Sequence, residues 1–319
     1  SNSSDFDTKN NGIFVDGTSS KLEVNDSNFD IKSYKNNGVV IDGTGATDKN
    51  KISRSNFKIY NDYNDNIPAQ YHNAEKTGLL LKGAVGGNYG HSISNYAGTG
   101  TDYNNNTFDI EGPASGNEIQ RVSGVYLNGV SGDVKVGGTF NVNSSNAGSY
   151  NSGIFVDGTT NITTNTSSLN GFFNIKGGSY NTGVYLDKGA TVANIGDDFS
   201  NFGSRSKTTI ESGTYNVGAY LNQAKATYIS GNYKIASTAG SWNAGVLLRG
   251  DHGLSAGSQV DDIRGIYDIN SNSNDGIYVD RDSYFKQVVY STFNLNSEYS
   301  NGIYLQKDAT SSSKVNYST

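Results

Sequence analysis

The sequence predicts an all-β chain folded as a parallel β-helix, a β-solenoid of about ten coils with three short strands each. Three observations lead to this prediction. A glycine followed by alternating apolar residues recurs ten times in 319 residues. A second motif, made of an aromatic, a polar and an aliphatic residue, precedes most of these glycines. No stretch carries the period of a long amphipathic helix, and repeats of this length are typical of stacked coils.

The glycine motif predicts the first strand of each coil. The shortest spacing between copies is 26 residues, from Gly12 to Gly38, and the longest is 46, from Gly78 to Gly124. Because a coil has a minimum length and only its loops can grow, this range indicates coils joined by loops of different lengths. The motif begins at Gly12, Gly38, Gly78, Gly124, Gly153, Gly183, Gly218, Gly245, Gly276 and Gly302.

Two further segments complete each coil. One is a weaker apolar segment that ends, for example, at Val24, Val136, Ile229 and Val289. The other is the aromatic motif, which begins at Phe29, Phe57, Phe108, Phe140, Phe173, Tyr233, Tyr267 and Phe293 and is replaced once by TTI ending at Ile210. A propeller blade needs about 40 residues for four strands, more than a 26-residue coil holds, so a propeller is disfavoured. A right-handed coil is expected, because parallel crossovers strongly favour that hand.

We expect residues 1–319 to form one solenoid, a fragment of a longer surface protein, because the chain has no methionine and the first repeat begins close to its start. The last residues, SSSKVNYST, look like the opening strand of an eleventh coil. Inserted loops, which should set binding specificity, are predicted near residues 60–76, 83–106, 111–122, 188–207 and 250–262.

Composition excludes several classes of function. The absence of cysteine removes disulfides, thiolate chemistry and the common zinc frameworks. A net charge of -6 with interspersed acids and bases argues against nucleic acid and anionic membrane surfaces. No run of 18 apolar residues is present. His72, His91 and His252 fall in predicted loops without metal-binding spacing, so we predict no cofactor, no metal and no catalytic residue.

Strand alternation predicts an outward column of side chains on the first strands. The first and third residues after each glycine are aliphatic and should point inward, so the second should point outward. A long outward stripe marks a partner-binding surface, although stacked rings also stabilise a sheet without binding anything. The column comprises Phe14, Val40, Leu80, Tyr126, Phe155, Tyr185, Tyr220, Leu247, Tyr278 and Tyr304.

Two more columns precede the glycines. Aromatic residues stand three positions before five of them, at Tyr150, Tyr180, Tyr215, Trp242 and Tyr299. Together with the outward column they give the candidate ligand- or partner-binding residues, which are Tyr126, Phe155, Tyr185, Tyr220, Tyr278, Tyr304, Tyr180, Tyr215 and Trp242. Asparagines two positions before the glycines, at Asn10, Asn36, Asn151, Asn181, Asn216, Asn243 and Asn274, predict a hydrogen-bonded ladder at a corner.

Paired aspartates follow the first strands of neighbouring coils. Asp16 and Asp42 form one such pair, and Asp157 and Asp187 form another. Their expected separation suits glycoside hydrolysis. Three of the four are followed by glycine, however, and an Asp-Gly pair at the end of a strand is typical of a turn. We therefore interpret them as turn residues.

The repeated G-[IVA]-[FYL]-[VL]-[DN] motif, the asparagine-rich corners and the lack of cysteine resemble the passenger domains of bacterial type V autotransporters over the whole chain. This resemblance implies a right-handed β-helix displayed on the surface of a Gram-negative cell. It also implies a C-terminal translocator, absent from this fragment, as the only link to the membrane. Similar coil motifs occur in phage tailspikes and polysaccharide lyases.

We therefore expect an adhesin or autoaggregation domain without enzymatic activity. Its partners would be host or bacterial surface receptors, protein or glycan, or copies of itself. A polysaccharide-degrading β-helix enzyme is the alternative, and it would require a groove with two or three carboxylates, or with Lys or Arg beside carboxylates, on one sheet. A passive stalk is a third possibility.

Overall fold

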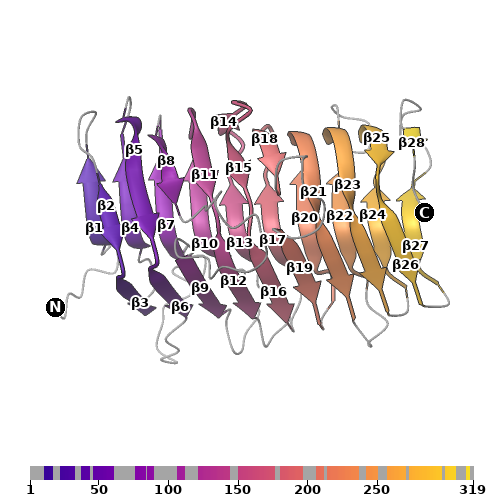
Figure 1. Ribbon diagram of the computed structural model, residues 1–319, viewed down its shortest axis with the longest axis horizontal. Helices are drawn as coiled ribbons and strands as arrows, with labels where there is room; N and C mark the ends of the chain where they lie inside the picture. Colours follow the sequence, from indigo (N-terminus) through magenta and orange to yellow (C-terminus); the bar gives the residue numbers. More distant parts are fainter. Residues whose placement is uncertain are drawn as a thin grey trace, which may run out of the picture.

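Ten first strands stack into one parallel ladder, which confirms the predicted fold class and number of coils. The computed structural model describes residues 11–16, 22–32, 37–43, 46–60, 76–83, 85–89, 106–111, 121–143, 150–176, 180–196, 206–211, 214–236, 242–250, 257–270, 273–296, 299–306 and 314–316. Within these ranges the regular structure is entirely β (Figure 1). Successive coils lie side by side along an elongated stack.

The first ladder contains the strands that follow the repeated glycines. Neighbouring strands are parallel and keep the glycine motif in register, so that Ile13 pairs with Val39 and Phe14 with Val40. The ladder runs through β1 (Asn11–Asp16), β4 (Asn37–Asp42), β7 (Lys76–Lys82), β10 (Arg121–Asn128), β13 (Tyr150–Val156), β17 (Asn181–Leu186), β20 (Val217–Asn222), β22 (Ala244–Arg249), β24 (Asp275–Val279) and β27 (Asn301–Leu305).

The second ladder contains the weaker apolar segments of the coils. Most of its strands are short, and the fifth coil contributes two pieces, β14 and β15. The ladder comprises β2 (Glu23–Asn25), β5 (Ala46–Ser53), β8 (Val85–Tyr89), β11 (Val134–Val136), β14 (Asn161–Ile162), β15 (Ser168–Leu169), β18 (Thr191–Ile195), β21 (Lys225–Ile235), β23 (Gln259–Ile269), β25 (Tyr284–Val289) and β28 (Lys314–Asn316).

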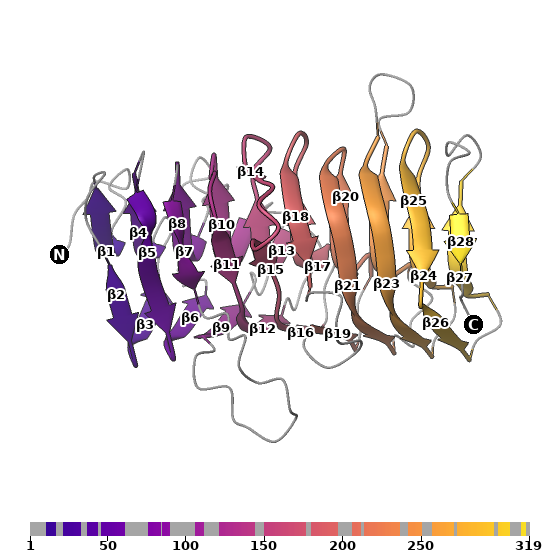
Figure 2. The ribbon, with the colours of Figure 1, turned by 45° about the horizontal axis from the view of Figure 1, so that its top comes forward.

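The third ladder contains the aromatic motif. It is joined to the second ladder because β21 and β23, each of 11 residues, run through both without a break, as Figure 2 shows. Together the two ladders form one sheet of 18 strands. The strands of the third ladder are β3 (Asn28–Lys32), β6 (Asn56–Tyr60), β9 (Asn106–Glu111), β12 (Gly138–Asn143), β16 (Phe172–Lys176), β19 (Lys207–Ile210), the second halves of β21 and β23, and β26 (Thr292–Leu295).

The aromatic rings of the third ladder point inward and stack from coil to coil. The rings of Phe29, Phe57, Phe108, Phe140 and Phe173 form one column, with centroids 4.7–4.9 Å apart. Thr208 interrupts it, and Tyr233, Tyr267 and Phe293 form a second column at 5.1 and 4.8 Å. The spacing matches that of neighbouring strands, so the coil repeat itself brings the rings into contact.

This ring column explains the repeated glycine of the first ladder. A Cβ atom on Gly153 would lie 2.8 Å from the carbonyl oxygen of Gly183 and 2.8 Å from the ring of Phe173. Gly218 and Gly276 meet the next glycine carbonyl at 2.6 Å and an aromatic ring at 2.7–2.9 Å in the same way. Glycine is therefore required because the ring column and the next coil occupy the position of a side chain.

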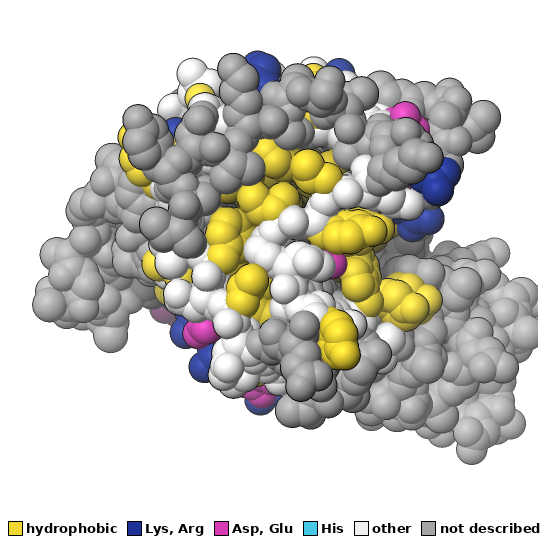
Figure 3. Space-filling model, turned by 90° about the vertical axis from the view of Figure 1, so that its right-hand side faces the viewer, with side chains coloured by type: hydrophobic (Ala, Val, Ile, Leu, Met, Phe, Trp, Pro, Cys, Tyr) yellow, Lys and Arg dark blue, Asp and Glu magenta, His cyan; other side chains and the backbone are white. Residues whose placement is uncertain are grey.

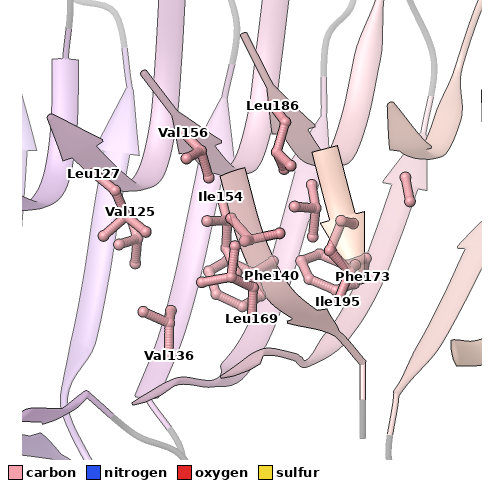
Figure 4. Packing of buried hydrophobic residues seen from close by; sticks show 14 of the residues in the cluster. Val125, Leu127, Val136, Phe140, Ile154, Val156, Leu169, Phe173, Leu186 and Ile195 are labelled. Atoms are coloured by element: carbon pink, nitrogen blue, oxygen red, sulfur yellow. The ribbon is translucent and has the colours of Figure 1, made fainter. Parts of the chain in front are cut away.

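The core is a continuous column of aliphatic side chains between the ladders. The first and third residues of the glycine motif, such as Val125 and Leu127, are fully buried, as predicted. Figure 4 shows these residues directed toward Leu169 and toward the rings of Phe140 and Phe173. Hydrophobic side chains also show at the end of the stack that carries β27 (Figure 3). Leu305 of the tenth coil is half exposed.

The structure differs from the sequence prediction at four segments. The ranges 83–106, 188–207 and 250–262, predicted as inserted loops, contain β8, β18 and the first residues of β23. Strand β8, VGGNY, has only one aliphatic residue, whereas β18 and β23 carry the alternating apolar residues of second-ladder strands within segments that were predicted as loops. The C-terminal residues do not open an eleventh coil. Strand β28 pairs with β25 and is the second strand of the tenth coil. The remaining parts of the five predicted loops lie largely outside the described residues.

Candidate functional site

The nine aromatic residues predicted from the sequence gather in two strips at the outer face of the first ladder. Their placement follows from strand register, since Tyr126 pairs with Phe155 and Tyr185 pairs with Tyr220 across neighbouring coils. The first strip comprises Tyr126, Phe155, Tyr185 and Tyr220. The second strip comprises Tyr180, Tyr215, Trp242, Tyr278 and Tyr304.

Ring angles alternate along the first strip. The ring of Phe155 stacks on Tyr185 with a centroid distance of 5.2 Å and an interplanar angle of 6°. The ring of Tyr126 meets Phe155 edge-on at 73°, and Tyr220 meets Tyr185 edge-on at 85°. Offset-stacked and edge-to-face arrangements are the favoured geometries of aromatic pairs. The four rings of the first strip are therefore in continuous contact, and Phe155 is buried between Tyr126 and Tyr185.

The second strip is continuous over five coils and changes column on the way. Tyr180 and Tyr215 stack at 5.4 Å, and Tyr215 meets Trp242 at 6.1 Å. Trp242 then contacts Tyr278 edge-on at 4.9 Å, and Tyr278 stacks on Tyr304 at 5.0 Å. The second strip therefore begins in the column three positions before the repeated glycine, with Tyr180, Tyr215 and Trp242. It ends in the outward column two positions after the glycine, with Tyr278 and Tyr304.

The two strips meet at a small apolar cluster on the outer face. Leu247, Val217 and Ala244 are buried there, and Tyr220, Trp242 and Tyr278 pack against them. Leu247 occupies the outward position at which the aromatic column is interrupted. The cluster fixes rings of both strips against one support, so the strips form one surface.

Hydrogen bonds hold the tyrosine hydroxyl groups of the strips. Tyr185 donates to Asp187 Oδ1 at 3.3 Å, and the side chain of Asn222 donates to the Tyr185 hydroxyl at 3.2 Å. Arg249 Nη1 donates to the Tyr220 hydroxyl at 2.9 Å. Because each partner lies on the same coil or the next, the rings are fixed in orientation.

A buried carboxylate lies beside the second strip. Asp275 Oδ2 accepts a hydrogen bond from Trp242 Nε1 at 3.1 Å, and Asp275 Oδ1 accepts one from Asn301 Nδ2 at 2.8 Å. Burial raises the pKa of Asp275 above its ordinary value, although these two hydrogen bonds act in the opposite direction. Asp275 therefore positions the indole of Trp242.

Two residues of the second strip adopt a left-handed backbone. The φ angles of Tyr180 and Tyr215 are 63° and 59°, and Ser273 at the equivalent corner has 63°. Bulky residues rarely adopt this conformation, which is costly compared with glycine or asparagine at the same corner. Tyr180 and Tyr215 are 39% and 44% exposed. Exposed aromatic side chains thus occupy two corner positions whose left-handed backbone conformation is unfavourable for bulky residues.

The outward column is less exposed than the sequence predicts. Phe14 is 55% exposed and Tyr304 is 40% exposed, but Val40, Leu80, Phe155 and Leu247 are buried. Phe155 and Leu247 are covered by rings of adjacent coils. Tyr299 is 71% exposed and has no ring contact with the described part of the chain, and the side chain of Tyr150 lies outside that part.

The asparagine column forms the predicted ladder. Asn151 Nδ2 donates to Asn181 Oδ1 at 3.1 Å, and Asn181 Nδ2 donates to Asn216 Oδ1 at 3.1 Å. The ladder continues through Asn243, whose Nδ2 donates to Asn274 Oδ1 at 3.0 Å. All five side chains are buried. Asn10 and Asn36 lie outside the described residues.

The paired aspartates have turn and structural partners. Asp42 forms an ion pair with Lys82 at 2.5 Å. Asp157 Oδ1 accepts the backbone N–H of Thr159 at 2.8 Å, which closes a turn, and Asp187 holds Tyr185. The backbone carbonyls of Asp157 and Asp187 also accept the N–H groups of Thr160 and Ala190, so these two aspartates are turn residues as predicted.

A groove on the third ladder was not predicted from the sequence. It has a volume of about 530 Å³ and runs from Lys58 on β6 across β9, β12 and β16 to Glu211, which follows β19. Half-buried Asp109, Asn141 and Asn174 form its floor, since they are register partners on consecutive strands. The polar middle residue of the aromatic motif could have indicated the floor of the groove. Which of these polar residues become neighbours, however, depends on the register in which the coils stack.

The groove contains the residue types that the polysaccharide-cleaving alternative requires. Asp109, Glu111 and Glu211 lie on one sheet with Lys58 and Lys176. Asp109 Oδ1, however, accepts a hydrogen bond from Asn141 Nδ2 at 2.7 Å, and Glu211 forms an ion pair with Lys176 at 2.7 Å. Two of the three carboxylates are thus already engaged.

The described ranges contain no group of three or more His, Cys, Asp or Glu side chains arranged to hold a metal ion. His72, His91 and His252 lie outside those ranges. The same ranges contain no helix long and apolar enough to cross a membrane. Comparisons of the chain with protein-family models, with curated proteins and with solved structures give no match.

Proposed function

We propose that the chain is an adhesive domain of a bacterial surface protein, and that it binds a receptor, without catalysis, through the two aromatic strips. The observation that carries the proposal is the second strip, in which five rings are in continuous contact and Tyr180, Tyr215 and Tyr304 remain 39–44% exposed. Tyr and Trp are enriched at protein interfaces because each offers a large rigid apolar body with a polar tip.

The geometry supports binding over a purely stabilising role for the rings. Stacking on the inner side of the third ladder already joins the coils, and those rings are mostly buried. Tyr180 and Tyr215 in the second strip are exposed and adopt a left-handed backbone conformation. Neither property is required if the rings only stabilise the stack of coils. A stiff stack of coils also keeps a long strip in one orientation, so little conformational entropy is lost on binding.

The proposed setting is the outer surface of a Gram-negative cell, with a translocator outside this chain providing the link to the membrane. The resemblance to autotransporter passengers and the absence of cysteine support this setting. The receptor would be a protein or glycan of a host or bacterial surface, and self-association would produce autoaggregation.

Two double variants test the proposal. Tyr180→Ser with Tyr215→Ser removes exposed rings of the second strip, and Tyr185→Ser with Tyr220→Ser removes rings of the first. Bacteria that display the chain should lose adhesion or aggregation by about tenfold or more with either pair, because each aromatic anchor at an interface is worth about 2 kcal/mol. Tyr299→Ser is the matched control, since Tyr299 is a more exposed tyrosine at the equivalent corner and has no ring contact with the described chain.

Unchanged adhesion and aggregation in both double variants would show that the aromatic strips are not the binding surface and would overturn the proposal. A glycan array followed by a reducing-end assay tests the absence of catalysis. Binding without new reducing ends is expected, and depolymerisation of a bound polysaccharide would replace the proposal with the enzymatic alternative.

A further inference from the structure

The groove on the third ladder lies on a different sheet from the aromatic strips and has its own chemistry. Its volume of about 530 Å³ is in the range of small-molecule and cofactor sites. It spans five coils, from Lys58 on β6 to Glu211 directly after β19, which are four intervals of roughly 4.8 Å, or about 19 Å along the solenoid. This length suits an extended chain better than a compact metabolite.

The floor of the groove is a fixed row of polar groups. Asn174 Nδ2 donates to Asn141 Oδ1 at 2.8 Å, and Asn141 Nδ2 donates to Asp109 Oδ1 at 2.7 Å. An amide has two N–H donors and two acceptor lone pairs. Each of these two bonds uses one donor of one side chain and one acceptor of the next, so Asn141 keeps one donor and one acceptor beyond the row. A hydroxyl group, which donates and accepts, is the matching ligand group.

Four of the five charged side chains that line the groove lie beside a side chain of opposite charge, and Glu111 is the fifth. Lys176 pairs with Glu211 at 2.7 Å, and Lys58 is the register partner of Asp109. A strongly anionic or cationic ligand would meet attraction from one charge and repulsion from its neighbour. A neutral ligand with many hydroxyl groups meets donors and acceptors along the whole groove.

We propose that this groove binds a neutral oligosaccharide, which lies along the row of Asp109, Asn141 and Asn174. Successive coils present equivalent polar groups to successive parts of the sugar chain. Glu111, exposed at the end of β9, accepts hydrogen bonds from sugar hydroxyls at the rim of the groove. This site is separate from the aromatic strips and does not depend on their function.

Calorimetric titration of the intact chain tests the proposal. The probes are neutral linear hexasaccharides of gluco, manno, galacto and xylo configuration, with a sulfated hexasaccharide and a chitosan hexamer as charged comparisons. Saturable binding of at least one neutral probe is expected. Its affinity should change little between 50 and 500 mM salt, because no net charge is neutralised.

Three single variants locate the binding. Asn141→Ala and Asn174→Ala should each weaken binding about tenfold or more. Asn294→Ala is the matched control, since Asn294 is the outward register partner of Asp268 in the same ladder, outside the groove, and it should bind as the unaltered chain does. Glu111→Gln should retain affinity within about threefold, because an amide oxygen replaces the carboxylate as acceptor. Thermal unfolding of each variant verifies that it is folded.

Several results would overturn the inference: no saturable binding of any neutral probe at millimolar concentration, tighter binding of a charged probe, or equal losses in Asn294→Ala and Asn141→Ala. The Tyr180→Ser, Tyr215→Ser double variant should bind the probes normally. A loss of probe binding in that variant would place the site on the aromatic strips and contradict the groove assignment.

Discussion

At the scale of single residues, the hydroxyl group of Tyr267 is an unusual feature of the core. The ring lies in the inner aromatic column between Tyr233 and Phe293, and its buried oxygen has no hydrogen-bond partner in the described part of the chain. An unpaired buried hydroxyl costs about 1 to 3 kcal/mol, because it loses its water without compensation. Burial raises the pKa of Tyr267 well above its ordinary value for the same reason.

Tyr267→Phe is therefore expected to increase the free energy of unfolding by about 1 to 3 kcal/mol. Urea denaturation at neutral pH measures the change. Tyr89→Phe is the control, because the buried Tyr89 hydroxyl is hydrogen-bonded by Asn50, and its removal should destabilise the chain. If both substitutions destabilise to the same extent, the Tyr267 hydroxyl has a partner and the prediction is wrong.

Asp275 gives a prediction about pH. Burial raises its folded-state pKa above the value near 3.8 expected when the chain is unfolded. Between these two pKa values the folded state binds more protons than the unfolded state, so this residue contributes less stability as the pH rises. Its contribution is fully present below the unfolded pKa and is lost as the pH passes through the folded pKa.

Asp275→Asn removes this titration. The free energy of unfolding of the variant, relative to that of the unaltered chain, should increase as the pH rises from 3 to 7. Denaturant unfolding at several pH values measures the difference. A constant difference over this interval would show that the pKa of Asp275 is the same in both states, and a falling difference would show a lowered pKa.

At the scale of strands, the glycine column and the ring column depend on each other. Gly153→Ala would place a Cβ atom 2.8 Å from the Gly183 carbonyl oxygen and from the ring of Phe173, and neither can move without shifting a coil. We expect a loss of about 1 to 3 kcal/mol from overpacking. Gly231→Ala is the matched control, because its nearest contacts lie at 3.4 Å. Thermal unfolding compares the two variants, and an equal loss in both would contradict the packing argument.

The sequence predicts the ladders well where side-chain periodicity decides the structure. The ten glycine motifs gave the first ladder with its inward residues, such as Val125 and Leu127, because alternation and burial coincide there. Strand β8, VGGNY, has two glycines and few apolar residues, so its pairing comes from the coils on either side. The local sequence of such a strand shows no alternation of apolar and polar residues from which it could be predicted.

The candidate surfaces could be predicted only in part. The outward rings of the aromatic strips follow from strand alternation, whereas Tyr180, Tyr215 and Trp242 follow from their repeated position three residues before the glycine. Their exposure depends on neighbouring coils, and Phe155 is buried because Tyr126 and Tyr185 cover it. The floor of the groove joins residues that are 32 and 33 positions apart. Because the loops differ in length, the sequence spacing alone does not show that these residues are register partners.

At the scale of the whole molecule, stability comes from contacts between neighbouring coils, since each coil touches only the coils beside it. Central coils bury their inward side chains completely, as Ile154 and Val156 show, whereas Leu305 in the tenth coil is half exposed. In the asparagine ladder and in the ring columns, a side chain of an inner coil likewise contacts two neighbouring coils, whereas a side chain of an end coil contacts one. Opening an end coil therefore breaks about half as many contacts as opening an inner one.

Amide hydrogen exchange of the 319-residue chain should show this difference as a gradient. Amides of β1 and β27 are expected to exchange fastest within the first ladder, and those of β13 and β17 slowest, because local opening starts at the ends of the stack. Mass spectrometry of peptides covering each first-ladder strand measures the rates. Gly153→Ala, in the centre, should increase exchange in the coils on both sides of β13 and leave β1 and β27 nearly unchanged. Uniform exchange across all ten strands would instead mean that the solenoid opens as one cooperative unit, and the nearest-neighbour account of its stability would be wrong.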